Sequence, residues 1–439
     1  MATTDTVAAS EPVLPLWLGS NRFGVHEHTR FQGSAGLAGS VSADIGPGFL
    51  LQSSLVARYR ASENNELIVP EAWAGASYRG VLLRGGIVPI TLGKLPNPEL
   101  SSGSMAVSKN ARPIPRITFG LEGFRPVPLL GSFLETDFGI SHGWFTDDRY
   151  VEGALLHEKW LYLRIKREGF FGVHAGIVHE AMWGGDSPSA APVNFDNYLR
   201  VFFGRSGGED ASTSDQINAL GNTLGIWDFG IDLEFSGATL HGYYQHHFEG
   251  MGSFWRFRNA HDGLWGATVE LKEPRRYLPS HFLYERMITK FQSGPYHDIG
   301  DIQLGGRDSY YSNGTYRSGW THYGRIIGTP FFRTAGEFED LRIASNRVDV
   351  HHYGVGGAIG DRTSYRFLFS RVSHRQAYAP VTLVAPDSKK VQWHLLLELE
   401  QTQLFGLEQL NGTAGFGFDT GELYDTTVGM LLSASWKLW

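Results

Sequence analysis

The segment Tyr424–Leu438 alternates between apolar and polar side chains, and this pattern constrains the fold more than any other feature of the chain. One face carries Tyr424, Val428, Met430, Leu432, Ala434, Trp436 and Leu438, and the other carries Thr427, Gly429, Ser433, Ser435 and Lys437. A period of two residues is typical of a β-strand with two different faces. Comparable runs recur at Leu161–Ile165, Phe171–Ile177, Phe229–Phe235, Leu240–Gln245, Trp265–Leu271, Tyr365–Arg371 and Trp393–Glu400. No helical periodicity is sustained over four turns, so the chain is predicted to be all-β.

Two kinds of antiparallel protein show this alternation. A soluble sandwich buries the apolar face of Phe229–Phe235, whereas a membrane barrel turns that face to lipid and points Asp228 and Asp232 into a wet lumen. The alternating strand runs to Trp439, and a barrel would pair this exposed edge by closing the last strand onto the first. Only 19% of the residues are charged, mean hydropathy is −0.20, and no run reaches the ~18 apolar residues of a spanning helix. We therefore predict a transmembrane antiparallel β-barrel of the outer-membrane type with long loops.

Composition and local motifs exclude several classes of function. The chain has no Cys, which rules out disulfides, thiolate metal sites and Cys nucleophiles, and its net charge of −7 argues against nucleic-acid binding. His157-Glu158 and His179-Glu180 lack the second His of a zinc protease motif, and the adjacent His246 and His247 would point to opposite faces of a strand. We predict no metal, no cofactor and no enzymatic activity, although no local pattern excludes an outer-membrane hydrolase with a Ser and an oriented His.

Residues 1–15 are small and polar with two prolines, and are predicted to form a flexible tail before a single barrel domain over residues 16–439. They contain neither a basic nor an apolar segment of a signal peptide, so we expect that a signal has been removed. Three long loops rich in Gly, Pro and polar residues are expected at 89–116, 204–222 and 305–330.

The loop 305–330 concentrates aromatic and planar polar side chains without helical or strand-like spacing. Tyrosine rings can stack on sugars, and Arg or Asn side chains can bind hydroxyl and acidic groups. The alternative is that the same rings fill the lumen. The candidate glycan-binding residues are Arg307, Asp308, Tyr310, Tyr311, Asn313, Tyr316 and Arg317, with Arg112, Arg116 and Trp183 as a second group.

Several longer motifs resemble the Wzi-type capsule assembly family of Gram-negative outer-membrane proteins. They are His157–Ile165 (HEKWLYLRI), Gly176–Gly185 (GIVHEAMWGG), Asp262–Gly266 (DGLWG), Tyr284–Tyr296 (YERMITKFQSGPY), Asn97–Arg116 and the loop 305–330. The resemblance extends from about Leu16 to Trp439. It implies an eighteen-stranded barrel in the outer membrane that holds capsular or related surface polysaccharide as a lectin, with polysaccharide and outer-membrane lipid as its partners. Family members can carry a periplasmic helical bundle before the barrel, whereas this sequence begins close to the first strand. The alternative function is a porin or transport channel for small solutes, which would need an open lumen.

Overall fold

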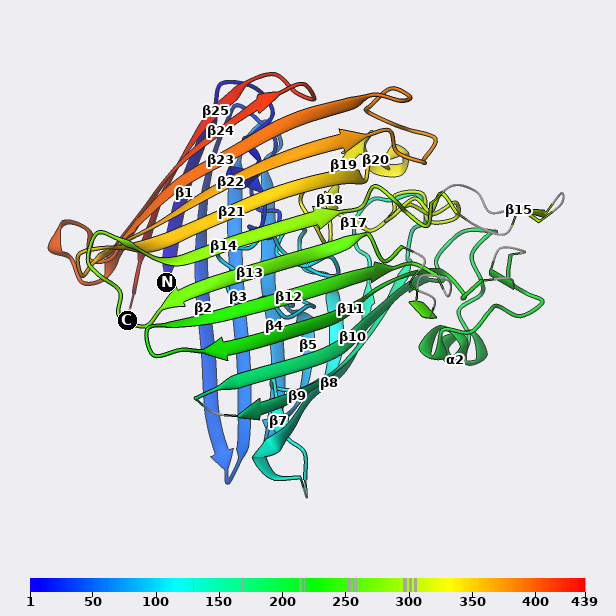
Figure 1. Ribbon diagram of the computed structural model, residues 1–439, viewed down its shortest axis with the longest axis horizontal. Coiled ribbons are helices and arrows are strands. Elements are labelled where there is room, and N and C mark those ends of the chain that lie inside the picture. The colour runs from blue at the N-terminus through cyan, green and yellow to red at the C-terminus, as the bar shows by residue number, and fades with distance from the viewer. Residues whose placement is uncertain are drawn as a thin grey trace.

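The computed structural model describes residues 1–438 except 129, 168, 213–214, 217, 251–253, 256, 258, 295–297, 300–301 and 304–305, so that Gly305 and Trp439 lie outside the described residues. One antiparallel sheet dominates it (Figure 1). Its strands are β1 (Ala2–Ala9), β2 (Phe31–Gly46), β3 (Phe49–Ala61), β4 (Glu66–Tyr78), β5 (Val81–Ile87), β6 (Pro115–Leu121), β7 (Arg125–Pro126), β8 (Leu134–Trp144), β9 (Leu155–Arg167), β10 (Phe171–Trp183), β11 (Asn222–Glu234), β12 (Ala238–Phe248), β13 (Gly263–Leu271), β14 (Pro279–Ile288), β21 (Arg347–Ile359), β22 (Thr363–Arg375), β23 (Lys389–Gln401), β24 (Leu410–Gly421) and β25 (Thr427–Trp436).

These 19 strands form a closed barrel of 18, because β6 and β7 both pair with β8 and together make one interrupted strand. Each strand pairs with the next along the chain, β14 pairs with β21 across the longest connection, and β25 pairs with β1. The all-β prediction and the expected eighteen-stranded barrel are both confirmed.

Closure of the barrel depends on the N-terminal strand β1. Ala2–Ala9 pairs with β2 on one side and with β25 on the other, in a register that runs from Ala2 opposite Trp436 to Ala9 opposite Gly429. The predicted flexible tail over residues 1–15 is therefore wrong for this segment. Its side chains do alternate, with Asp5 and Val7 buried and Thr6 exposed. They are too small to give the hydrophobic contrast by which the other strands were identified, and β1 is ordered instead by hydrogen bonding on both edges.

The two ends of the barrel differ in their connections. One end has short turns, such as 47–48, 79–80, 235–237 and 360–362, and the first and last strands begin and end there. The other end has the long connections 10–30, 88–114, 184–221 and 289–346, which cover or overlap the three long loops expected from the sequence. Outer-membrane barrels place short turns in the periplasm and long loops outside the cell, so the long-loop end is extracellular.

The outer wall is apolar. On β9, Leu161, Leu163 and Ile165 are 48%, 46% and 38% exposed, while Tyr162 between them is buried in the lumen. On β11, Phe229 and Ile231 point outward and Asp228 points inward, so the sequence pattern matches a barrel and not a sandwich. A wall of this kind is covered by lipid, and the protein is an outer-membrane barrel.

The helices and short strands lie in the connections between barrel strands. They are α1 (Leu16–Gly19), η1 (Gly131–Phe133), α2 (Phe195–Phe203), β15 (Asp298–Ile299), β16 (Ile302–Gln303), β17 (Thr321–His322), β18 (Arg325–Ile326), β19 (Arg333–Ala335), η2 (Phe338–Asp340), β20 (Arg342–Ser345) and η3 (Leu404–Gly406). Among the described residues, no helix is long and apolar enough to cross a membrane.

Parts of three connections, residues 10–30, 88–114 and 306–332, fold into the lumen, and we call them the plug. The backbone N–H of Leu16 donates to Asp419 of β24 (2.9 Å), and the N–H of Met105 donates to Gln245 of β12 (3.0 Å). Ser108 Oγ donates to the carbonyl of Gly328 (2.6 Å), which joins two of the connections to each other. The plug therefore contacts both the walls and itself across the lumen.

If β1 closes the barrel, then Thr6→Pro should prevent its assembly, because proline removes a ladder N–H from a strand that is paired on both edges. The expected cost is about 3 kcal/mol or more. The measurement is the yield of folded barrel in outer-membrane fractions, with Thr6→Ala as a control that keeps the N–H. Normal assembly of the proline variant would contradict a structural role for β1.

Candidate functional site

Three of the predicted glycan-binding tyrosines lie inside the plug. Tyr310, Tyr311 and Tyr316 are at most 3% exposed. The Tyr310 hydroxyl donates to Asp262 (3.0 Å), that of Tyr316 donates to the carbonyl of Gly184 (3.1 Å), and that of Tyr311 donates to the carbonyl of Met105. Burial raises the pKa of each phenol above its ordinary value, so all three stay neutral donors. These rings fill the lumen, which is the alternative that the sequence left open for this loop.

Asp308 and Asn313 shape the same loop. The Asn313 side-chain oxygen accepts the backbone N–H groups of Thr315 (2.8 Å) and Tyr316 (3.0 Å), which is an Asx turn. Asp308 accepts a hydrogen bond from Ser293. Both side chains are half-buried, so part of each stays open to solvent.

Arg116 and Trp183 are both buried. Arg116 is 2% exposed on the lumen wall, where it forms an ion pair with Glu158 and donates to the carbonyl of Ile114 (3.0 Å). Trp183 is buried on the outer wall, with its ring 6.0 Å from that of Tyr198 in α2.

The remaining predicted arginines each stack on a tyrosine at the extracellular end. The guanidinium of Arg317 lies 4.3 Å from the ring centre of Tyr150, and that of Arg112 lies 4.3 Å from the ring of Tyr323. Arg307 lies 5.6 Å from the ring of Tyr378. Tyr150 is 37% exposed and Tyr323 is 43% exposed, so these stacks stand at the surface.

Three further arginines join this arrangement, and the sequence analysis missed them. Each contacts a tyrosine ring, with Arg342 5.4 Å from Tyr150, Arg347 3.9 Å from Tyr378 and Arg333 5.9 Å from Tyr424. We call the whole set the Tyr–Arg surface: Tyr150, Tyr323, Tyr378, Tyr424, Arg112, Arg307, Arg317, Arg333, Arg342 and Arg347. Its tyrosines come from separate connections, where a single Tyr gives no local signal. Only the fold brings them to the same end of the barrel.

The charge on this surface is only partly neutralised. Arg333 donates to the carbonyl of Pro330 (2.8 Å), Arg342 to that of Glu339 (2.6 Å) and Arg347 to that of Lys290 (2.9 Å). In the part of the chain that the structure describes, none of these three forms an ion pair with a carboxylate. Their positive charge is therefore available to an anionic ligand.

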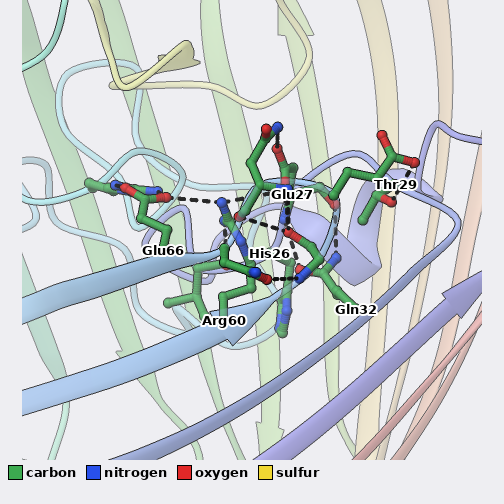
Figure 2. Close-up of polar contacts among 12 residues, drawn as sticks. His26, Glu27, Thr29, Gln32, Arg60 and Glu66 are labelled. Carbon is green, nitrogen blue, oxygen red and sulfur yellow. Dashed lines mark hydrogen bonds and ion pairs between the residues drawn. The ribbon is translucent and has the colours of Figure 1, made fainter.

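Arg112, in contrast, belongs to a neutralised network of ion pairs. Both of its terminal nitrogens donate to Glu66 (2.5 and 2.6 Å). Figure 2 shows Arg60 between Glu66, at 2.9 Å, and Glu27, at 3.4 Å. Both terminal nitrogens of Arg112 are thus occupied by Glu66, and its guanidinium lies beside the ring of Tyr323, so this residue positions the loop more than it attracts an anion.

A cavity of about 250 Å³ lies between the plug and the connection 422–426. Arg325, Arg333 and Tyr424 are among the side chains that line it. Arg325 donates only to backbone carbonyls, those of Gly19 (3.2 Å) and His26. Burial and the nearby arginines lower the pKa of Arg325 to about 10, which leaves it charged at neutral pH. Asp419 also lines the cavity, but its carboxylate is already bonded to the plug. The cavity can hold a small acidic group beside the Tyr–Arg surface.

Metal chemistry has no support in this arrangement. Within the described ranges, no group of three or more His, Cys, Asp or Glu side chains lies close enough to hold a metal ion. The arginine and tyrosine side chains can recognise a ligand through ionic and aromatic contacts.

Acidification should loosen the plug through His322. This side chain is 1% exposed, it donates through Nδ1 to the carbonyl of Arg112 (2.8 Å), and its Nε2 lies 3.3 Å from the Thr146 hydroxyl. Burial lowers the pKa of His322 to about 4, below the ordinary 6.5 of the unfolded chain. The contribution of neutral His322 to the free energy of unfolding is therefore complete above pH 6.5. It falls by about 1.4 kcal/mol per pH unit toward pH 4.

The measurement is hydrogen exchange of the plug at pH 8 and pH 5, corrected for intrinsic rates. We expect faster exchange at pH 5 in the normal protein and a smaller pH difference in His322→Gln. Burial lowers the pKa of His26 to about 3, so part of the effect should remain in that variant. Equal corrected exchange at both pH values in the normal protein would contradict the assignment.

Comparison with known proteins gives one family and one main structural likeness. The profile of the family described as Capsule assembly protein Wzi matches residues 18–343. Among solved structures, the chain is similar to Wzi of Escherichia coli, an outer-membrane protein involved in group 1 capsule assembly and described as a carbohydrate-binding β-barrel. That likeness has a TM-score of 0.63 at 12% identity and covers 100% of this chain and 85% of the other. OccK5 (OpdH) of Pseudomonas aeruginosa is more distant, with a TM-score of 0.51 at 9% identity over 99% of this chain and 96% of the other. No curated protein sequence matches the chain.

Proposed function

Because the chain belongs to the Wzi capsule assembly family, we propose that it anchors acidic surface polysaccharide to the outer membrane through the Tyr–Arg surface. The observation that carries the proposal is a set of arginines beside extracellular tyrosine rings that form no ion pair with a carboxylate among the described residues, namely Arg333, Arg342 and Arg347. Carbohydrate binding by the similar E. coli barrel supports it.

The recognition chemistry follows from the stacks. A guanidinium beside a ring can donate from its remaining N–H groups to a uronate carboxylate or a phosphate. The exposed part of the same ring can pack against a sugar face. Because Tyr150, Tyr378 and Tyr424 stand in separate connections, one polymer can contact several weak sites at once. Repeated weak contacts give retention without tight binding at any one site.

The protein acts as a binding protein in this proposal and catalyses no reaction. The binding surface consists of arginine and tyrosine side chains that contact intact polymer. The buried carboxylates Glu158 and Glu180 lie on the lumen wall and not at the Tyr–Arg surface, so they are not placed to act on a bound chain.

Binding should depend on charge and on the stacked arginines. We expect the double variant Arg317→Ala, Arg342→Ala to bind a uronate-containing polysaccharide about 10- to 100-fold more weakly, since each lost charged hydrogen bond is worth about 1.5–3 kcal/mol before compensation. The measurement is surface plasmon resonance on protein in nanodiscs, at low and high salt. The matched control is Arg276→Ala, an exposed arginine in the short-turn connection 272–278, paired with Asp361. Equal binding of the same polymer after reduction of its carboxyl groups would overturn the proposal.

The rival function, a transport channel, is disfavoured by the plug. Its core includes fully buried rings such as Trp320, Phe331 and Phe332, and it bonds to the barrel wall at β12 and at β24. We expect no stable single-channel conductance from the normal protein in planar bilayers, and open channels when residues 306–330 are replaced by a short Gly-Ser linker. Shortening the connection 184–221, whose helix lies outside the lumen, should not open the barrel. A large stable conductance from the normal protein would favour transport.

A further inference from the structure

The connection 184–221 carries a helix that has no role in the plug or in the Tyr–Arg surface. Helix α2 begins after Asn194, whose side chain accepts the backbone N–H of Asn197 (2.8 Å), and ends at Gly204, which has a φ of 63°. These are a standard N-cap and a left-handed C-cap, so the helix has defined ends. It lies at the extracellular end of the barrel (Figure 1).

One face of α2 packs on the outer wall of the barrel. The ring of Tyr198 lies 5.6 Å from that of His157 in β9 and 6.0 Å from that of Trp183 in β10, and Phe202 lies 5.4 Å from His157. Along β9, His157 shares its side of the strand with Leu161, whose side chain is exposed on the outer wall. The helix therefore sits outside the barrel, directly above its lipid-facing wall.

A second face of α2 is apolar and uncovered. Phe195, Leu199 and Phe203 are 74%, 37% and 61% exposed. They are spaced four residues apart, so they form one stripe along the helix. Val193, just before the helix, is 60% exposed.

A third face is polar. Asp196 and Arg200 form an i,i+4 ion pair (2.8 Å), and Asp196 is 74% exposed. At 100° per residue, the apolar stripe is centred between the two other faces, about 80° from this pair on one side and about 80° from Tyr198 and Phe202 on the other. The helix thus divides its surface among protein, apolar surroundings and water, as an amphipathic helix does at a membrane interface.

The apolar stripe continues a surface that already faces lipid. Below α2, the outer wall of β9 exposes Leu161, Leu163 and Ile165. At the same end of the barrel, Trp144 ends β8 and is 39% exposed, and Trp255 in the connection 249–262 is 65% exposed. Aromatic residues gather at this level in outer-membrane barrels, because their rings prefer the boundary between headgroups and acyl chains.

We propose that α2 is an interfacial anchor that inserts Phe195, Leu199 and Phe203 into the outer leaflet beside β8–β10. In this position, the apolar stripe of the helix contacts the acyl-chain region of the membrane. The anchor holds the connection 184–221 against the bilayer, and the hydrogen bond from Tyr316 to the carbonyl of Gly184 ties that connection to the plug. The inference does not depend on polysaccharide binding.

The absence of Cys from the chain makes a direct test possible. Single-cysteine variants Phe203→Cys and Asp196→Cys, labelled with the same fluorophore, place the probe on the apolar and polar faces of one helix. Leu163→Cys on the barrel wall is the positive control for lipid contact. The full chain is reconstituted in liposomes without polysaccharide, with and without a doxyl-labelled phospholipid, and quenching by aqueous iodide is measured separately.

We expect doxyl lipid to quench the Phe203→Cys probe at least threefold more than the Asp196→Cys probe and nearly as much as the Leu163→Cys probe, with iodide giving the reverse order. Equal quenching at positions 203 and 196 would overturn the proposal. Protection of the probe at position 203 from both quenchers, together with disulfide cross-linking between two unlabelled copies of the Phe203→Cys variant, would also overturn it, because a second copy would then cover the stripe.

Discussion

The closed ladder of backbone hydrogen bonds is the constraint on which every other feature depends. A sheet in lipid cannot leave an edge unpaired, because no water is present to satisfy its N–H and C=O groups. The last edge is closed by Ala2–Ala9, which pairs with β25 and β2 at once. Its Asp5 forms an ion pair with Arg58 and accepts from Ser433 (2.6 Å), so the lumen side of the seam is bonded as well. Only a closed wall can hold the plug and present the loops.

The long strands were predictable because their side chains differ strongly between faces. Phe229 and Ile231 alternate with acids, and the structure turns the former to lipid and Asp228 into the lumen. The segment Ala2–Ala9 could not be recognised in the same way. Its Thr and Ala side chains carry almost no hydrophobic contrast, and its order comes from pairing with β2 and with β25, which is more than four hundred residues away in sequence. A local pattern cannot contain that information.

The candidate site was predictable only in part, for a related reason. The aromatic density of 305–330 marks an unusual segment, but the direction of each ring is set by distant acceptors such as Asp262 for Tyr310 and Met105 for Tyr311. Arg317 was identified because it lies in that dense segment. Its stacking partner Tyr150 was not, since a lone tyrosine in a separate connection has no distinguishing neighbours.

Aromatic residues serve three environments in this barrel, and their polar partners distinguish them. In the plug, a phenol such as that of Tyr310 is bonded within the protein, so no group remains for a ligand. At the membrane rim, Phe195 and Phe203 carry no polar group and need none. At the extracellular end, Tyr150 and Tyr378 each lie beside two guanidinium groups. Among the described residues, Arg342 and Arg347 bond to backbone carbonyls and form no ion pair with a carboxylate, and in the proposed function an acidic polymer supplies that partner.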